Sequence, residues 1–140
     1  MYHIYLISFK ETNDVYIGKT TQSINNRLEQ HLKRNSTIKK YVNTKLKGKW
    51  TSVNIDIIDT VNTDKDIKHL YKLLDKNITD EEINILENNK QLYNNIYNKK
   101  LQILEHYHIM EYKNNNKYNL INVRIPIDYS YDNYKIVMYY

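Results

Sequence analysis

The 140-residue chain has no cysteine and no alanine, and it contains only two glycines, one proline, one tryptophan and three arginines. The absence of cysteine excludes disulfide scaffolds, thiolate zinc sites and thiol nucleophiles. No apolar run reaches the length of a membrane span, and the first residues lack the pattern of a signal peptide. We therefore expect a soluble, intracellular protein that does not enter membranes.

The abundant residues are 15 tyrosines, 20 asparagines, 18 lysines and 19 isoleucines. Their codons are AT-rich, which favours an AT-rich genome such as that of a phage or large virus. Single tyrosines, asparagines or lysines are consequently weak signals, whereas the rare glycines and arginines are informative. The length is typical of a single domain, which we place over residues 1–140.

Charge is unevenly distributed around a net value of +5. Residues 1–52 hold ten basic and three acidic side chains, whereas residues 53–112 hold seven and eleven. This asymmetry indicates a face that meets a polyanion, with a solvated basic surface as the alternative. The basic residues of the stretch 33–49, which has no acidic residue, are the candidates for that contact: Lys33, Arg34, Lys39, Lys40, Lys45, Lys47 and Lys49. Trp50 follows them, and core packing is the favoured reading over stacking on a base.

Hydrophobic periodicity predicts strands at 2–9, 15–18 and 53–57, the first two forming a hairpin. Helices are predicted at 20–34, with Ser23 as N-cap, at 36–47, ending at Gly48, and at 64–75. A capping-box pattern at Thr79 opens a helical region to 112, either two helices with a break near 88–95 or one long helix. A loop at 113–117 and strand-like pieces at 120–140 follow. The fold class is a small α/β sandwich, with a three-stranded antiparallel sheet flanked by helices.

Two tyrosines of the hairpin and two side chains of the first helix form a candidate site. If the aliphatic residues of both strands face the helices, Tyr5 and Tyr16 emerge together on the opposite face. Cross-strand aromatic packing is the simpler explanation of that pairing. Arg27 and His31 lie one helical turn apart, beside the apolar stripe of their helix. Such a pair is most often structural, but arginine suits bidentate phosphate contact.

The segments His3-Ile4-Tyr5 and Tyr16-Ile17-Gly18-Lys19-Thr20, followed by Arg27 and His31 on a helix, resemble the GIY-YIG nuclease family. The first motif departs from the family, because His3 stands where its glycine would be. The resemblance implies a metal-binding glutamate on a later helix, for which Glu105 fits best and Glu82, Glu87 and Glu111 fit less well. It also implies an asparagine, Asn119, with Asn122 as the alternative.

The resemblance is close over residues 3–32 and loose over 101–122. Relative to the family's compact module, residues about 65–98 form a helical insertion, and 123–140 form a short C-terminal β extension. Glu105 also has support of its own, since a carboxylate beside an apolar stripe needs a partner. A metal is one such partner and a buried salt bridge is the other.

The resemblance implies a metal-dependent endonuclease that hydrolyses DNA phosphodiester bonds with one Mg²⁺ or Mn²⁺ held by Glu105. Arg27 would hold the scissile phosphate and His31 would orient a tyrosine or bind phosphate. Tyr5 would be the base and Tyr16 its support, or the reverse, with the phenol pKa lowered by Lys19, Arg27 or the metal. Asn119 would support the site.

The expected partner is DNA, duplex or branched, and Lys19 joins the basic residues that contact it. A homodimer or a protein partner would use the helical insertion. One alternative function is a catalytically inactive nucleic-acid-binding module, which the substitution at His3 would explain. Another is a protein-interaction module, which buried Tyr5 and Tyr16 and a Glu105–lysine pair would favour.

Overall fold

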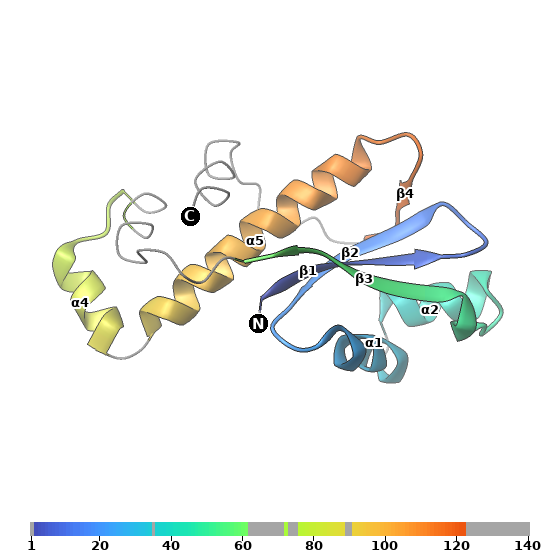
Figure 1. The fold of residues 1–140 in the computed structure, drawn as a ribbon, viewed down its shortest axis with the longest axis horizontal. Helices are drawn as coiled ribbons and strands as arrows, with labels where there is room; N and C mark the ends of the chain where they lie inside the picture. The colour runs from blue at the N-terminus through green and yellow to red at the C-terminus, as the bar shows by residue number, and fades with distance from the viewer. Residues whose placement is uncertain (1, 35, 62–71, 73–75, 89–90, 123–140) are drawn as a thin grey trace.

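A twisted sheet lies at the centre of the computed structural model, which describes residues 2–34, 36–61, 72, 76–88 and 91–122 (Figure 1). The strand order is β3-β1-β2-β4. Strand β1 (His3–Phe9) is antiparallel to both β2 (Asp14–Thr20) and β3 (Val53–Thr60). The strands β2 and β3 are thus longer than the alternation pattern predicted.

A fourth strand corrects the expected three-stranded antiparallel sheet. Strand β4 (Asn119–Leu120) runs parallel to β2, so the sheet is mixed. Its backbone is joined to the hairpin by Asn119 N–H donating to Asn13 O and Ile121 N–H donating to Val15 O, each at 2.9 Å. A two-residue strand is too short to show the period-two alternation by which strands are recognised.

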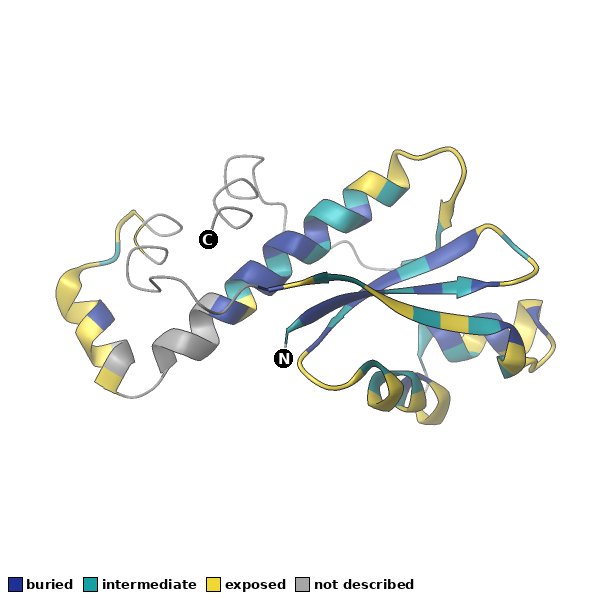
Figure 2. Cartoon of the chain, viewed as in Figure 1, coloured by how far each residue is buried: buried dark blue, intermediate teal, exposed yellow. Residues whose placement is uncertain are grey.

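Helices cover both faces of the sheet, and two separate hydrophobic clusters result (Figure 2). One face packs on α5 (Gln91–Lys113), where Ile4 and Ile17 meet Leu101 and Leu104. The other face packs on α1 (Ile24–Lys33) and α2 (Thr37–Lys45). Residues Tyr5, Ile7, Phe9, Ile38, Tyr41, Val42 and Leu46 are buried in that second cluster. Tyr5 and Tyr16 do share a face, as predicted, but that face is covered rather than open.

Serine caps set the starts of the two helices on the tyrosine face. Ser23 accepts a hydrogen bond from Asn26 N–H at 3.2 Å, which confirms it as the N-cap of α1. Ser36 likewise accepts from Lys39 N–H at 3.1 Å and caps α2. The first helix therefore begins at Ile24 rather than at residue 20. A left-handed turn ends the α2 segment at Lys47 and Gly48.

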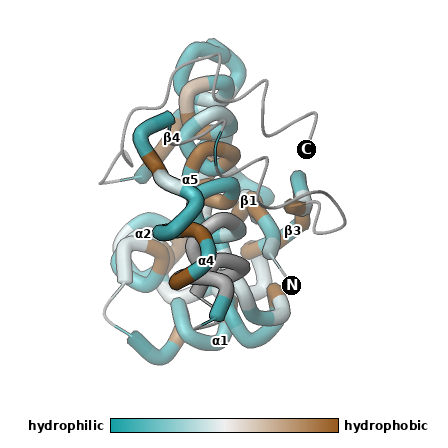
Figure 3. The backbone as a smooth tube through the Cα atoms, turned by 90° about the vertical axis from the view of Figure 1, so that its left-hand side faces the viewer, coloured by the Kyte–Doolittle hydropathy of each residue, from teal (hydrophilic) through white to brown (hydrophobic). Residues whose placement is uncertain are grey.

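The second half contains α4 (Asp80–Asn88), which lies at the far end of α5 from the sheet (Figure 1). Thr79 accepts a hydrogen bond from Glu82 N–H at 3.2 Å, which confirms the predicted cap. Helix α4 ends at Asn88 and α5 begins at Gln91, so this region forms two helices rather than one. The helix predicted at 64–75 lies largely outside the described residues, and the extension at 123–140 lies wholly outside them. Figure 3 shows hydrophobic stretches in β1, β3 and α5, whereas α1 is mainly hydrophilic. No described helix is long and apolar enough to cross a membrane.

Candidate active site

Tyr5 anchors the site, and Gly18 makes room for it. The two residues are paired across β1 and β2, and the Tyr5 side chain is fully buried. A Cβ atom at position 18 would lie 2.3 Å from both Cζ and the hydroxyl oxygen of Tyr5. The tyrosine ring therefore lies directly over the glycine, which explains why one of the chain's two glycines stands here.

The Tyr5 hydroxyl joins two side chains of α1. Arg27 donates a hydrogen bond from Nε to the phenol oxygen at 3.1 Å, and His31 Nε2 lies 2.9 Å from the same oxygen. The phenol donates its own proton to His31 Nε2 when that nitrogen carries no proton. Burial, together with the nearby Arg27 charge, lowers the pKa of His31 to about 4. A neutral imidazole is the form that can accept this hydrogen bond.

Tyr16 completes the aromatic cluster and is only half-buried. Its ring centroid lies 6.4 Å from that of Tyr5 and 5.6 Å from that of His31, the latter in an edge arrangement. It lines a hollow of about 330 Å³ with Arg27, Gln30, His31, Arg34, Ser36 and Thr37. Of the two tyrosines, Tyr16 is the one that faces this hollow.

Burial raises the pKa of both phenols. For Tyr5 the neighbouring Tyr16 adds to the rise, and for both residues Arg27 acts in the opposite direction without outweighing burial. Of the cations expected to lower the phenol pKa (Lys19, Arg27 or a metal), Arg27 does act in that direction, but burial outweighs it. Desolvation of the anionic phenolate is the larger effect at a covered sheet face.

Glu105 approaches from α5, on the other side of the sheet, at the edge of β2. Strand alternation places Lys19 on the α5 side, and its Nζ lies 3.8 Å from Glu105 Oε1. Within the described residues, β4 pairs only with the first two residues of β2, so the edge beyond them has no strand neighbour. Burial raises the pKa of Glu105, against the lowering effects of Lys19 and Arg27.

A second hollow, of about 280 Å³, bridges the helices at this edge. It is lined by Lys19, Thr20, Thr21, Gln22, Arg27, Gln30, Asn98 and Leu101. It shares Arg27 and Gln30 with the first hollow. The Glu105 charge also acts on Tyr5 and Tyr16. Five predicted site residues, Tyr5, Tyr16, Arg27, His31 and Glu105, are thus brought together with Lys19 around one edge of the sheet.

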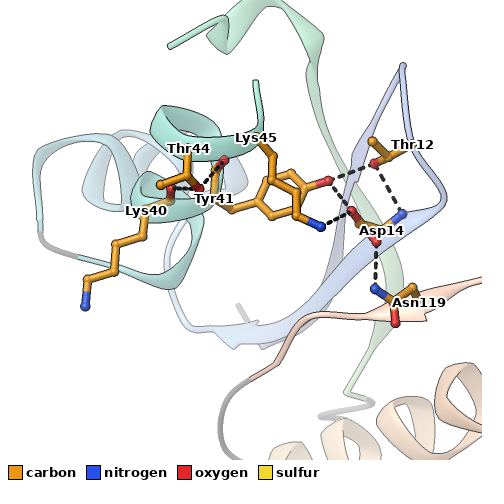
Figure 4. A network of polar contacts seen from close by, with 7 residues as sticks. All are labelled: Thr12, Asp14, Lys40, Tyr41, Thr44, Lys45 and Asn119. Carbon is orange, nitrogen blue, oxygen red and sulfur yellow. Dashed lines mark hydrogen bonds and ion pairs between the residues drawn. The ribbon is translucent and has the colours of Figure 1, made fainter. Parts of the chain in front are cut away.

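Asn119 lies outside this cluster. Its Nδ2 donates to Asp14 Oδ1 at 2.8 Å, at the hairpin end of β2 (Figure 4). Tyr41 donates a very short hydrogen bond to the other carboxylate oxygen of Asp14, and Thr12 lies 2.9 Å from the Tyr41 hydroxyl. Burial alone would raise the pKa of Asp14, but these hydrogen bonds outweigh it and hold the pKa below its ordinary value. Asn119 therefore belongs to a network that fastens the hairpin to α2 and β4.

Asn122, the alternative asparagine, is nearer the cluster. Its side-chain amide donates to Ile17 O at 2.7 Å and accepts from Ile17 N–H at 3.0 Å. Ile17 stands between Tyr16 and Gly18, so this amide fixes the backbone that carries both residues. The two asparagines are close in sequence, but the pairing of β4 with β2 places them differently. Asn119 lies at the hairpin end of β2, and Asn122 lies beside Ile17.

The predicted DNA-contacting residues lie mainly on the outer surface of α1, α2 and the segment after α2. Lys33, Arg34, Lys40, Lys45, Lys47 and Lys49 are exposed, and Lys39 is half-buried. Lys45 lies 4.0 Å from Asp14 and over the ring of Tyr41. Trp50 packs half-buried against the α2 cluster, which confirms the core-packing interpretation.

Gln30 and Gln22 also belong to the site, although no sequence motif marked them. Arg27 Nη1 donates to Gln30 Oε1 at 2.9 Å, and Gln30 Nε2 donates to Gln22 Oε1 at 2.7 Å. The spacing of three residues between Arg27 and Gln30 on one helix was the available signal.

The donor set suits a hard divalent cation held weakly by the protein. No group of three or more His, Asp or Glu side chains capable of holding a metal occurs among the described residues. Glu105 is a largely buried carboxylate beside Lys19, and their contact of 3.8 Å is longer than a hydrogen bond. Mg²⁺ commonly uses one or two carboxylates and completes its shell with waters and substrate phosphates. A single carboxylate whose neighbour Lys19 lines a hollow fits that pattern.

Comparison with known proteins gave one family match. A model described as the GIY-YIG catalytic domain matches residues 1–119. No curated protein and no solved structure gives a significant match. The matched range contains both tyrosines, both α1 side chains and the α5 glutamate, and it ends at Asn119.

Proposed function

The chain belongs to the GIY-YIG family of nucleases, and from this we propose that it is an endonuclease that hydrolyses DNA phosphodiester bonds with one divalent cation, Mg²⁺ or Mn²⁺. The observation that carries the proposal is the meeting of α1 and α5 side chains at the open edge of β2. There the Arg27 guanidinium lines both hollows, the Tyr16 phenol lines one of them, and the Glu105 carboxylate lies 3.8 Å from Lys19, which lines the other. Phosphodiester hydrolysis needs a positioned water, neutralisation of charge on the phosphate and help for the leaving oxygen, and these groups can supply them.

Arg27 is the phosphate-binding group in this proposal. Arg27 lines both hollows, and its Nε donates a hydrogen bond to the Tyr5 hydroxyl. Guanidinium donors match phosphate oxygens and stabilise the charge that develops on them in the transition state. Glu105 would hold the cation, which supplies Lewis-acid stabilisation of the phosphate and the leaving oxygen.

Tyr16 rather than Tyr5 is the tyrosine that assists the attacking water. Tyr16 faces the hollow, whereas the Tyr5 hydroxyl is enclosed by Arg27 and His31. The raised pKa of Tyr16 keeps the phenol neutral near pH 7, and in that form it orients the water by hydrogen bonding. Tyr5 and His31 then position Arg27, and Asn122 supports the strand that carries Tyr16.

The alternative function, an inactive nucleic-acid-binding module, was suggested by His3 standing in place of the family's glycine. The contacts of His3 in the structure weaken that alternative. His3 is buried, and its Nδ1 lies 2.9 Å from Thr60 Oγ1 on β3, the strand on the far side of β1 from Gly18. The side chain that replaces the family's glycine is therefore used in joining strands. The Tyr5–Gly18 contact is formed in its presence.

Some features named for an interaction module are present, since Tyr5 is buried and Glu105 lies near Lys19. They do not favour it, because the Tyr5 hydroxyl is hydrogen-bonded to Arg27 and His31, both of which line a hollow.

DNA is the proposed partner, duplex or branched, with the exposed lysines and Arg34 of the α1–α2 surface contacting phosphates. Counterion release would make such binding weaken steeply with salt. Helix α4 begins with Asp80, Glu81 and Glu82 and exposes Ile85, so it suits a protein contact, including a second copy of the chain, better than DNA.

The deciding experiment compares Glu105→Gln with Glu111→Gln on supercoiled plasmid in Mg²⁺, Mn²⁺ or EDTA. Glu111 is an exposed carboxylate on the same helix and serves as the matched control. We expect cation-dependent nicking by the wild type and by Glu111→Gln, and loss of at least about a hundredfold in Glu105→Gln, as for removal of a group stabilising the transition state. Equal cutting by both variants would contradict the assignment of Glu105. Salt-sensitive binding without cutting would favour the inactive module.

A further inference from the structure

We propose that Gln30 is a positioning residue that fixes the plane of the Arg27 guanidinium for phosphate binding, with Gln22 setting the orientation of the Gln30 amide. The inference rests on the proposed function for its catalytic consequence. Its structural part concerns side-chain order and can be measured independently of any cleavage.

The Arg27 guanidinium is held at two of its nitrogens. Nε donates to the Tyr5 hydroxyl at 3.1 Å, and Nη1 donates to Gln30 Oε1 at 2.9 Å. One hydrogen bond leaves a planar group free to rotate about that contact, whereas two at different nitrogens fix its plane. A guanidinium has five N–H donors, so these contacts leave three for a phosphate.

Gln22 determines which end of the Gln30 amide faces Arg27. Gln30 Nε2 donates to Gln22 Oε1 at 2.7 Å, and this directs Gln30 Oε1 toward the guanidinium. A reversed amide would place an N–H group against the Arg27 donor and leave both unsatisfied. In the series of contacts from Gln22 through Gln30 and Arg27 to Tyr5, every donor therefore faces an acceptor.

A neutral acceptor is suited to this position. A carboxylate at position 30 would also accept from Arg27, but it would offset the positive charge that the phosphate requires. Gln30 also borders both hollows, as does Arg27. Gln30 can therefore orient the guanidinium where the two hollows adjoin, and there a phosphate between two nucleotides would lie.

Arginine side-chain NMR tests the structural part directly. The chain has only three arginines, and Arg27→Lys identifies the Arg27 Nε signal by its loss. In the wild type we expect slow rotation about the Arg27 Nε–Cζ bond. In Gln30→Met, which keeps the length of the side chain and removes its acceptor, we expect rotation to be several-fold faster. Asn25→Met, at an exposed amide of the same helix, is the control and should leave it unchanged.

Plasmid cleavage tests the catalytic part with the same variants. We expect Gln30→Met to lower kcat about tenfold with KM changed by less than about twofold, and Gln22→Met to have a smaller effect in the same direction. Gln30→Glu should keep Arg27 ordered, as in the wild type, but raise KM for DNA. If Gln30→Met leaves the rotation rate unchanged, the inference is wrong. Unchanged kcat with faster rotation would refute the positioning role, and a wild type that cuts no DNA would refute the proposed function but not the NMR result.

Discussion

Replacing Gly18 with alanine tests the packing that holds the Tyr5 hydroxyl between α1 and the sheet. The added methyl would lie 2.3 Å from two Tyr5 atoms, whereas non-bonded carbons are at rest near 3.5–4.0 Å. The ring would therefore have to move by about 1 Å or more. Because Tyr5 is fully buried and hydrogen-bonded to His31 and Arg27, such a movement disrupts those contacts.

The expected loss of stability is about 3 kcal/mol. Overpacking a buried site costs about 1–3 kcal/mol. Each weakened hydrogen bond adds about 0.5–1.5 kcal/mol. Removing a glycine from a strand returns about 0.5–1 kcal/mol. For a domain of this size that total corresponds to a fall in Tm of roughly 6–12 °C.

Urea denaturation followed by circular dichroism, arranged as a double-mutant cycle, measures the effect. In a Tyr5→Val background the clash is gone, so Gly18→Ala should be neutral or slightly stabilising. Gly48→Ala is the matched control, because a Cβ there has no atom within 4 Å and its cost comes from a φ of +80°. That cost should be the same in both backgrounds. Equal destabilisation by Gly18→Ala with and without Tyr5→Val would refute the packing argument.

Three further outcomes are expected. The pKa of His31 is about 4 in the folded protein, below its ordinary value of 6.5. As the pH falls, the unfolded chain therefore binds this proton before the folded protein does. The free energy of unfolding should then decrease as the pH drops from about 6.5 to 4. Urea unfolding at several pH values should show a smaller slope in His31→Gln, and an unchanged slope would count against the buried neutral imidazole. Lys19→Met should tighten Mn²⁺ binding several-fold by calorimetry, since it removes the ammonium beside Glu105; weaker binding would argue that Lys19 is not a competitor. Asn119→Ala should lower stability by about 1–2 kcal/mol with kcat unchanged, whereas Asn122→Ala should lower kcat, and the reverse pattern in paired unfolding and cleavage assays would restore Asn119 to the site.

Much of the site could be predicted because its parts are local. Strand alternation places Tyr5 and Tyr16 on one face, and helical spacing places Arg27 and His31 on one flank; both depend only on neighbouring residues. The rarity of glycine and arginine made Gly18 and Arg27 stand out in a chain rich in tyrosine and lysine. The caps at Ser23 and Thr79 were likewise recognisable from short patterns.

Long-range packing decided the rest. Alternation cannot show that helices cover both faces, so the burial of Tyr5 and the raised pKa of both phenols followed only from the placement of α1 and α2. A two-residue strand has no period, and β4 joins β2 through residues 105 positions apart, so the sequence did not show that Asn122 rather than Asn119 holds the backbone between Tyr16 and Gly18.

Short sequence patterns were enough to predict the hairpin, the helix caps at Ser23 and Thr79, the shared face of the two tyrosines and the family, because each depends on residue types at short spacing. Only the three-dimensional packing showed that the Arg27 and Glu105 charges lie close enough to interact at the edge of β2, and that Tyr16 rather than Tyr5 faces the hollow. Both results depend on how the helices on the two sides of the sheet pack against it, rather than on local sequence.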